Sequence, residues 1–279
     1  MQSTKSKNEQ KNPNFTLSKE EITRYSRNIL LNEVGKKGQE KLKNSTVTVM
    51  GAGGLGSPAL FYLAACGIGN IRIIDSDILD LTNLQRQILH RTENISKLKT
   101  DSAEETLHSL NPWINIKKFS FRGKADNILS IIEGSDIVLE GSDNFETKFL
   151  INDACYFLKI PLIIGGILRF EGQLIGILPD STPCYRCIFH SPPPPDEIPS
   201  CAEAGVIGGV AGVIGSLQAT EAIKFILKIE ESRVFGKILN YDAKSLDFRK
   251  ISINKNPNCP LCGKNPLITE LHDSVSRVC

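Results

Sequence analysis

The sequence predicts an α/β protein in which a mostly parallel sheet carries helices on both faces, followed by a C-terminal β extension. Short apolar runs alternate with segments of helical periodicity through the first 160 residues. One of these runs, 47–50, ends in the glycine-rich segment GAGGLG, which is typical of a strand-to-helix turn in a Rossmann-like sheet. Further apolar runs in the second half lead to a motif of paired cysteines.

The periodicity assigns elements along the first half of the chain. Residues 1–16 are polar and are expected to form a disordered tail. Ser18 and Glu21 have the spacing of a capping box, so a helix is expected over 17–31. The other expected elements are strands over 47–50, 71–74, 114–121 and 137–139, and helices over 58–65, 99–110 and 145–158.

The second half departs from this alternation. Strands are expected over 162–168 and 173–178, and they precede a long loop that contains CYRC and four prolines at 192–195. Loops of this length are usually functional or mobile. A helix over 214–227 and a hairpin of strands over 238–241 and 248–253 complete the expected elements.

Composition excludes several classes of protein. The 33 Lys and Arg residues nearly balance the 31 Asp and Glu residues, which argues against a partner among nucleic acids or anionic membranes. The apolar stretch 206–217 is too short to cross a bilayer, and the polar N-terminus has no signal-peptide pattern. We therefore expect a cytoplasmic protein whose eight cysteines are metal ligands, reactive thiols or core residues rather than disulfides.

A nucleotide site is predicted at the first strand-to-helix turn. Gly51, Gly53 and Gly56 form G-x-G-x-x-G, and Asp75 follows 19 residues after the last glycine. The glycines let a phosphate approach the backbone at a helix N-terminus, and the acidic residue can bind a ribose hydroxyl. This pattern does not choose between NAD and ATP.

Two C-x-x-C pairs predict a zinc site. Cys184 with Cys187 and Cys259 with Cys262 supply the four thiolates of a closed tetrahedral centre. The alternative is two unrelated thiol pairs with a redox role. With 71 residues between the pairs, zinc would join the end of the chain to its middle as a structural clamp.

Polar residues near the expected nucleotide site allow two interpretations. Lys99 and the segment Thr82, Asn83, Leu84, Gln85 and Arg86 could face the ligand or be ordinary solvated residues. Asp143 and Asn144 follow the strand expected over 137–139, where a carboxylate could hold Mg²⁺ or either residue could cap the next helix. The four histidines show no ligand or triad spacing and are expected to be surface or core residues.

Read in this order, GAGGLG, NLQRQILH, GSDN, CYRC, SCAEAGV, GSLQATEAIK and CPLCG resemble the MoeB/ThiF/HesA family, bacterial relatives of ubiquitin-activating enzymes. The resemblance covers about residues 24–263. It implies ATP-dependent adenylation of the C-terminal glycine of a ubiquitin-like sulfur carrier ending in Gly-Gly, which prepares a thiocarboxylate for molybdopterin or thiamin biosynthesis. SCAEAGV, and CYRC ahead of the prolines, are closer to the molybdopterin-synthase activators than to the thiamin ones.

The same resemblance implies a domain organisation and a set of nucleotide-binding residues. Residues 17–279 would form a single adenylation domain, with a nucleotide-binding part over about 45–160 and a carrier-binding and zinc part over about 161–265. The implied contacts to ATP are Gly51, Gly53, Gly54, Gly56, Asp75, Thr82, Asn83, Leu84, Gln85, Arg86, Lys99, Asp143 and Asn144.

Catalytic roles also follow from the resemblance. Arg86 and Lys99 would contact phosphates, and Asp143 would hold Mg²⁺. Arg27 would reach into the partner's site in a homodimer, and Cys201 matches the position that binds the carrier covalently in some members. Attack of a carboxylate on a phosphate joins two anions, which explains the need for fixed cations and a metal.

Some points stay open. Acidic residues surround Cys201 in the sequence, so a nucleophilic thiolate and a plain exposed thiol are both compatible with its neighbours. Glu140 stands where family members often have Asp. A cysteine desulfurase or sulfurtransferase is expected to supply sulfur as a separate protein. The alternative functions are an NAD-dependent oxidoreductase and a non-catalytic scaffold that binds ubiquitin-like proteins.

Overall fold

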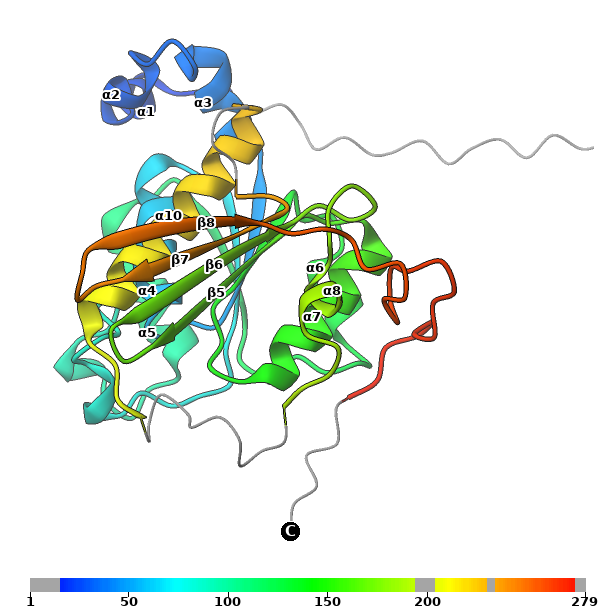
Figure 1. Cartoon of the computed structure of the whole chain (residues 1–279). Coiled ribbons are helices and arrows are strands. Elements are labelled where there is room, and N and C mark those ends of the chain that lie inside the picture. The colour runs from blue at the N-terminus through cyan, green and yellow to red at the C-terminus, as the bar shows by residue number, and fades with distance from the viewer. Residues whose placement is uncertain (1–15, 194–203, 230–233, 274–279) are drawn as a thin grey trace, which may run out of the picture.

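One eight-stranded sheet runs through the computed structural model, which describes residues 16–193, 204–229 and 234–273 (Figure 1). The strand order is β3-β2-β1-β4-β5-β6-β7-β8. Strands β1 to β5 are parallel to one another, and β6 to β8 continue the sheet antiparallel. The strands are β1 (Thr46–Met50), β2 (Asn70–Ile74), β3 (Asn115–Phe119), β4 (Ile137–Glu140), β5 (Leu162–Leu168), β6 (Glu171–Ile177), β7 (Lys237–Asp242) and β8 (Asp247–Ser252).

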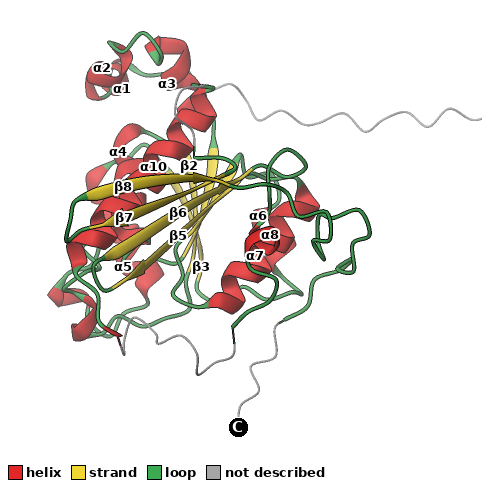
Figure 2. Ribbon diagram, viewed as in Figure 1, coloured by secondary structure: helices red, strands yellow, loops and turns green. Residues whose placement is uncertain are grey.

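Helices cover both faces of this sheet (Figure 2). Helices α4, α5 and α10 pack on one face, and α6, α7 and α8 pack on the other. The helices are α1 (Lys19–Arg24), α2 (Ser26–Ile29), α3 (Gly35–Lys43), α4 (Gly56–Cys66), α5 (Lys99–Leu110), α6 (Ile128–Ile132), α7 (Phe145–Leu158), α8 (Tyr185–Ile188) and α10 (Gly208–Leu227), with short 3-10 helices at Leu81–Asn83 and Thr92–Asn94.

The two helical layers explain why the central strands are apolar without interruption. Side chains alternate along a strand, so Ile163 of β5 packs under α4 and α10 while its neighbour Ile164 packs under α7. Val49 and Met50 of β1 divide between the two cores in the same way. Because both faces are buried, β-branched and other apolar residues fill consecutive positions. The predicted fold class is confirmed.

Helices differ from the expectation in three places, each with its own cause. The helix expected over 17–31 is broken at Tyr25, whose buried ring packs against Gly67 and whose hydroxyl accepts a hydrogen bond from Asn111. Helix α3 was missed because its one apolar residue, Leu42, leaves little periodicity in a lysine-rich segment. The helix expected from residue 214 begins at Gly208, since glycines in its first turns hid the start.

Helix α10 corrects the expectation that the longest apolar stretch is too short to span a bilayer. Its 20 residues are long and apolar enough for a membrane span by composition alone. The helix instead packs against α4, β5 and β6, and 44% of its most apolar window is buried. A Cβ atom at Gly215 would lie 2.3 Å from the backbone oxygen of Leu55, so α10 and the start of α4 approach at backbone distance.

We expect Gly215→Ala to lower the free energy of unfolding by about 1–3 kcal/mol, because the added methyl group would meet backbone rather than a movable side chain. Urea unfolding measures this change. The control is Ser216→Ala on the same helix, which removes an atom and should change stability by less than about 0.5 kcal/mol. Equal stability of the two variants would contradict the close packing of α10 on α4.

Candidate functional site

A cleft of about 1820 Å³ opens at the carboxyl ends of β1 and β4. The chain continues from β1 to β2 and β3 on one side and from β4 to β5 on the other, so the strand order reverses between β1 and β4. Ligands of open α/β sheets bind at such a reversal. The cleft extends from there across β5, β6 and β7. Its volume exceeds that of a usual small-molecule site and allows two substrates side by side.

The glycine-rich loop after β1 forms one wall of the cleft. Gly51 has φ +90°, a conformation that favours glycine, and a Cβ atom there would lie 3.2 Å from the backbone oxygen of Gly141. A Cβ atom at Gly56 would lie only 1.9 Å from the oxygen of Gly51, so helix α4 can begin against the loop only with glycine there. Gly51, Gly53 and Gly54 line the cleft, whereas Gly56 has this packing role.

The half-buried side chain of Asp75 and the buried side chain of His90 fix the backbone of this loop. The carboxylate of Asp75 accepts hydrogen bonds from the N–H groups of Ala52 at 2.7 Å and Asp77 at 2.8 Å. Nε2 of His90 lies 2.8 Å from the oxygen of Ala52, and Nδ1 lies 2.9 Å from Oγ of Ser102. Burial lowers the pKa of His90, which favours a neutral ring that donates from Nε2 to Ala52. Burial also raises the pKa of Asp75, and the charge of Lys99 opposes that shift.

The expected phosphate-binding cations line the same cleft. The side chain of Lys99 is 7% exposed, and its ammonium lies 2.6 Å from a carboxylate oxygen of Asp77. Arg86 lines the cleft and donates to the backbone oxygen of Thr82 at 3.1 Å. Both cations are therefore held at the end of the cleft that contains the glycine-rich loop.

Most of the segment before Arg86 does not reach the cleft. The hydroxyl of Thr82 donates to Asp80, and Asn83 completes a capping box with the same residue. Thr82, Asn83, Leu84 and Gln85 are absent from the described lining of the cleft. Gln87, the last residue of the same polar segment, does line it, and its buried Oε1 has no partner in the described part of the chain.

In the GSDN turn, different residues cap the next helix and face the cleft, a choice that the sequence left open. The side chain of Asn144 accepts a hydrogen bond from the N–H of Thr147 at 2.9 Å, so Asn144 is the N-cap of α7. Asp143 makes no cap, is exposed and lines the cleft. Glu140 is fully buried below this turn and bonds to Lys148 instead of reaching the cleft. Neither Glu140 nor Lys148 was expected to act as a pair, because only the fold brings their side chains together.

Two expected catalytic residues are not in this cleft. Arg27 is exposed on α2, and α1, α2 and α3 lie together beyond the amino end of β1 (Figure 1). It does not line the cleft of its own chain. Cys201 lies outside the described residues.

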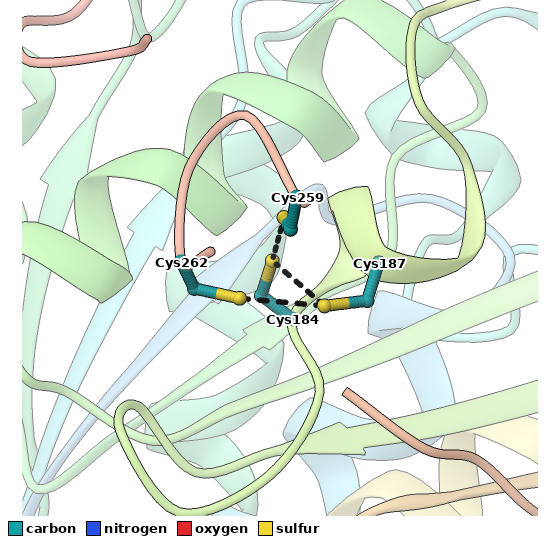
Figure 3. A group of neighbouring side chains, drawn as sticks. All are labelled: Cys184, Cys187, Cys259 and Cys262. Atoms are coloured by element: carbon teal, nitrogen blue, oxygen red, sulfur yellow. Dashed lines mark hydrogen bonds between the residues drawn. The ribbon is translucent and has the colours of Figure 1, made fainter. Parts of the chain in front are cut away.

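The four expected zinc ligands converge on one point (Figure 3). Their sulfur atoms all lie within 4.8 Å of one another, and three of the Sγ–Sγ pairs are 3.3, 3.5 and 3.9 Å apart. A tetrahedron with zinc–sulfur bonds of about 2.3 Å has sulfur atoms about 3.8 Å apart, which matches this cluster. The interpretation as two unrelated thiol pairs is wrong. The ligands are Cys184, Cys187, Cys259 and Cys262.

The thiol cluster is also connected to the cleft. Cys184 is the N-cap of the short helix α8, and the chain that leaves this helix at Phe189 lines the cleft as far as Pro193. The hydrogen bond between Cys184 and Cys262 lowers the pKa of Cys262 to about 5 and raises that of Cys184, and burial raises the pKa of Cys187. The thiolate form favoured at Cys262 is the form that binds a metal ion.

Several known proteins resemble this chain in sequence over most of its length. A sulfur carrier protein adenylyltransferase of Thermus thermophilus is 44% identical over 262 residues, which is 92% of this chain and 96% of that protein. A SAMP-activating enzyme E1 of Haloferax volcanii is 43% identical over 90% of this chain and 92% of its own length. An adenylyltransferase and sulfurtransferase of Culex quinquefasciatus is 45% identical over 97% of this chain, which spans 62% of that protein.

Solved structures and a family model extend the comparison. The structure of E. coli MccB with ATP has a TM-score of 0.75 and 27% sequence identity, over 86% of this chain and 74% of that one. The model of the ThiF family matches residues 25–261, which include the whole sheet and the first three thiol ligands. The chain therefore belongs to the ThiF family.

Proposed function

We propose that this protein uses ATP to adenylate the C-terminal glycine of a ubiquitin-like sulfur carrier ending in Gly-Gly. The observation that carries the proposal is the convergence of Asp75, Arg86, Lys99 and Asp143 on one cleft beside a glycine-rich loop. An adenylate-forming site needs such a nucleotide cradle with cations and a metal ligand. The names and identities of the relatives support the same activity.

The proposed reaction accounts for the charges in the cleft. A carboxylate oxygen of the carrier would attack the α-phosphorus of ATP, so that a carbon–oxygen–phosphorus anhydride forms, the α–β phosphate linkage breaks and pyrophosphate leaves. Arg86 and Lys99 would reduce the repulsion between the two anions. Asp143 would hold Mg²⁺, which supplies positive charge for the pyrophosphate. A separate sulfur donor, a cysteine desulfurase or a sulfurtransferase that carries a persulfide, would then displace AMP to give an acyl disulfide. A second thiol would break the S–S bond of this intermediate, which releases the thiocarboxylate and leaves a disulfide on the donor.

The part of the cleft over β5 to β7 would take the carrier's tail. A Cβ atom at Gly166 would meet nothing within 4 Å, so this edge of β5 leaves open space. Gln173 and Asn240 line the cleft further out and bond to each other at 3.1 Å. A tail of two glycines would fit over such a surface beside the nucleotide. We propose that this region receives the Gly-Gly ending.

A homodimer would complete the site. An apolar groove between α4 and α10 includes Tyr62 and Ile88, whose surfaces are 57% and 59% exposed. Burial of such side chains against a second copy would remove them from water. Arg27 lies outside its own cleft, so a role near ATP requires a second subunit.

We propose the cytoplasm as the compartment, because a reducing medium keeps the thiol cluster available for metal.

The thiol cluster would hold zinc as a structural centre. We expect about one tightly bound zinc per chain, because the four sulfur positions match a closed tetrahedral site. Cys262→Ser should reduce the zinc content to near zero and lower the melting temperature, as measured by elemental analysis and calorimetry. Cys66→Ser changes a half-buried thiol outside the cluster and should retain zinc. Freshly purified protein without zinc would exclude this assignment.

Adenylation predicts that exchange between ATP and labelled pyrophosphate requires a carrier ending in Gly-Gly. Asp143→Ala should reduce this exchange to background, because the phosphates lose a metal ligand. Asp126→Ala, at an exposed carboxylate that does not line the cleft, should exchange at the wild-type rate. ATP, but not NADH, should raise the melting temperature of the wild-type protein. Protection by NADH alone would favour an oxidoreductase.

The shared site predicts complementation between two inactive variants. A mixture of Arg27→Ala and Asp143→Ala chains should recover about a quarter of the wild-type rate, since half of the dimers are mixed and each has one intact site. A mixture of Arg86→Ala and Asp143→Ala should recover nothing, because both residues line the cleft of the same chain. Failure of the first mixture, with subunit exchange shown by differently tagged chains, would place Arg27 outside the partner's site.

A further inference from the structure

An ion pair lies buried below the turn that carries Asp143. The carboxylate of Glu140, at the end of β4, bonds to the ammonium of Lys148 on α7. The side chain of Glu140 is 0% exposed and that of Lys148 is 10% exposed. Burial raises the pKa of Glu140, and the charge of Lys148 opposes this shift. The hydrogen bonds that the carboxylate accepts favour its ionised form.

Lys148 uses its ammonium to join three parts of the cleft floor. It donates to the carboxylate of Glu140 on β4, to the backbone oxygen of Ser142 at 2.8 Å and to the backbone oxygen of Gly165 on β5 at 2.8 Å. An ammonium has three protons, so these acceptors match its donors one for one. The side chain thereby fixes the turn after β4 relative to the next strand.

Every polar group of Ser142 forms a hydrogen bond with Glu140 or Lys148. Its N–H donates to Glu140 at 2.7 Å, its hydroxyl donates to the same carboxylate oxygen, and its carbonyl accepts from Lys148. The backbone oxygen of Glu140 in turn accepts from Gln218 of α10 at 2.7 Å. Ser142 directly precedes Asp143, which is exposed in the cleft. The backbone that carries the Asp143 side chain is therefore fixed on its amino side.

Stability alone does not explain a pair of this kind. Desolvation of two charges costs free energy that their attraction often fails to offset, and an apolar pair of the same size can be equally stable. Three of the bonds of the Glu140–Lys148 pair go to one residue of a cleft turn, where apolar side chains could make no such bonds. Orientation of that turn is a function that only the polar pair can perform.

We propose that the Glu140–Lys148 pair is a positioning device that holds Asp143 for the divalent cation bound with ATP. The inference rests on the proposed function only in taking Mg-ATP as the ligand of this cleft. Glu140 does not line the cleft, and the ammonium of Lys148, which does line it, donates to Glu140, Ser142 and Gly165. They act through Ser142, as groups behind a metal ligand commonly do, and loss of such groups typically weakens metal binding by about 10- to 100-fold.

Calorimetric titration of ATP, with Mg²⁺ or with EDTA and without any carrier, tests the proposal. The double variant Glu140→Gln/Lys148→Met removes both charges at nearly constant volume, so no lone charge is left buried. It should bind ATP at least about tenfold more weakly than wild type with Mg²⁺, and within about twofold of wild type in EDTA. Asp143→Asn should show the same pattern. The triple variant Glu140→Gln/Lys148→Met/Asp143→Asn should bind ATP with Mg²⁺ no more weakly than Asp143→Asn alone, because the pair acts only through Asp143.

A second buried pair supplies the control. Lys43 and Glu21 bond at 2.7 Å, with side chains 19% and 3% exposed, near the amino end of the sheet. Glu21→Gln/Lys43→Met should lower the melting temperature without changing the Mg²⁺ dependence of ATP binding. The proposal is overturned if the Glu140→Gln/Lys148→Met variant also keeps the wild-type Mg²⁺ dependence. It is likewise overturned if the variant loses as much ATP affinity in EDTA as with Mg²⁺, because the pair is then merely structural.

Two further measurements separate the possible failures. If circular dichroism shows that the double variant does not fold, Ser142→Ala decides the question, because it removes one bond to Glu140 and keeps both charges. It should weaken ATP binding with Mg²⁺ and not in EDTA; no effect would count against the proposal. Absence of carrier-dependent pyrophosphate exchange in the wild type would refute adenylation, whereas the titrations would still report on the pair. If the wild type binds ATP with the same affinity with Mg²⁺ and in EDTA, the proposed role of the pair is refuted.

Discussion

The site depends on the close approach of two backbone turns, which follow β1 and β4. The N–H of Gly141 donates to the oxygen of Met50, and the Cα of Gly51 leaves no room for a side chain beside Gly141. Because these strands are parallel neighbours, their carboxyl ends bring the glycine-rich loop and the Asp143 turn to the same edge of the sheet. The cations and carboxylates of the cleft would have no common centre without this contact.

Hydrogen bonds to four side chains, three of them buried, then set the shape of both turns. On one side Asp75 and His90 bind the N–H and the carbonyl of Ala52, and on the other Glu140 and Lys148 bind the polar groups of Ser142. These four side chains have long sequence separations from one another or lie on different elements. Loops normally expose their backbone to water, so this degree of internal bonding gives a preorganised cleft.

The sequence predicted the elements that depend on local pattern. The sheet and most of its helices follow from periodicity, the glycine positions from backbone geometry, and the four thiols from spacing. Patterns could not show that Tyr25 would break the first helix, because its partners Gly67 and Asn111 are distant in sequence. The choice between Asp143 and Asn144 as the cap of α7 stayed open in the sequence, and the buried Glu140–Lys148 pair below them depends on the packing of α7 on β4.

The thiol cluster has a consequence for how the chain is made. Its last two ligands follow β8, so all eight strands leave the ribosome before the four sulfur atoms can meet. The glycine-rich loop, the Asp143 turn and the first thiol pair are already synthesised by then. Closing this long loop costs chain entropy that a metal bond can offset. Binding of the proposed zinc would thus be a late event in biogenesis, and cells short of zinc would accumulate chains with a formed sheet and a loose C-terminal segment.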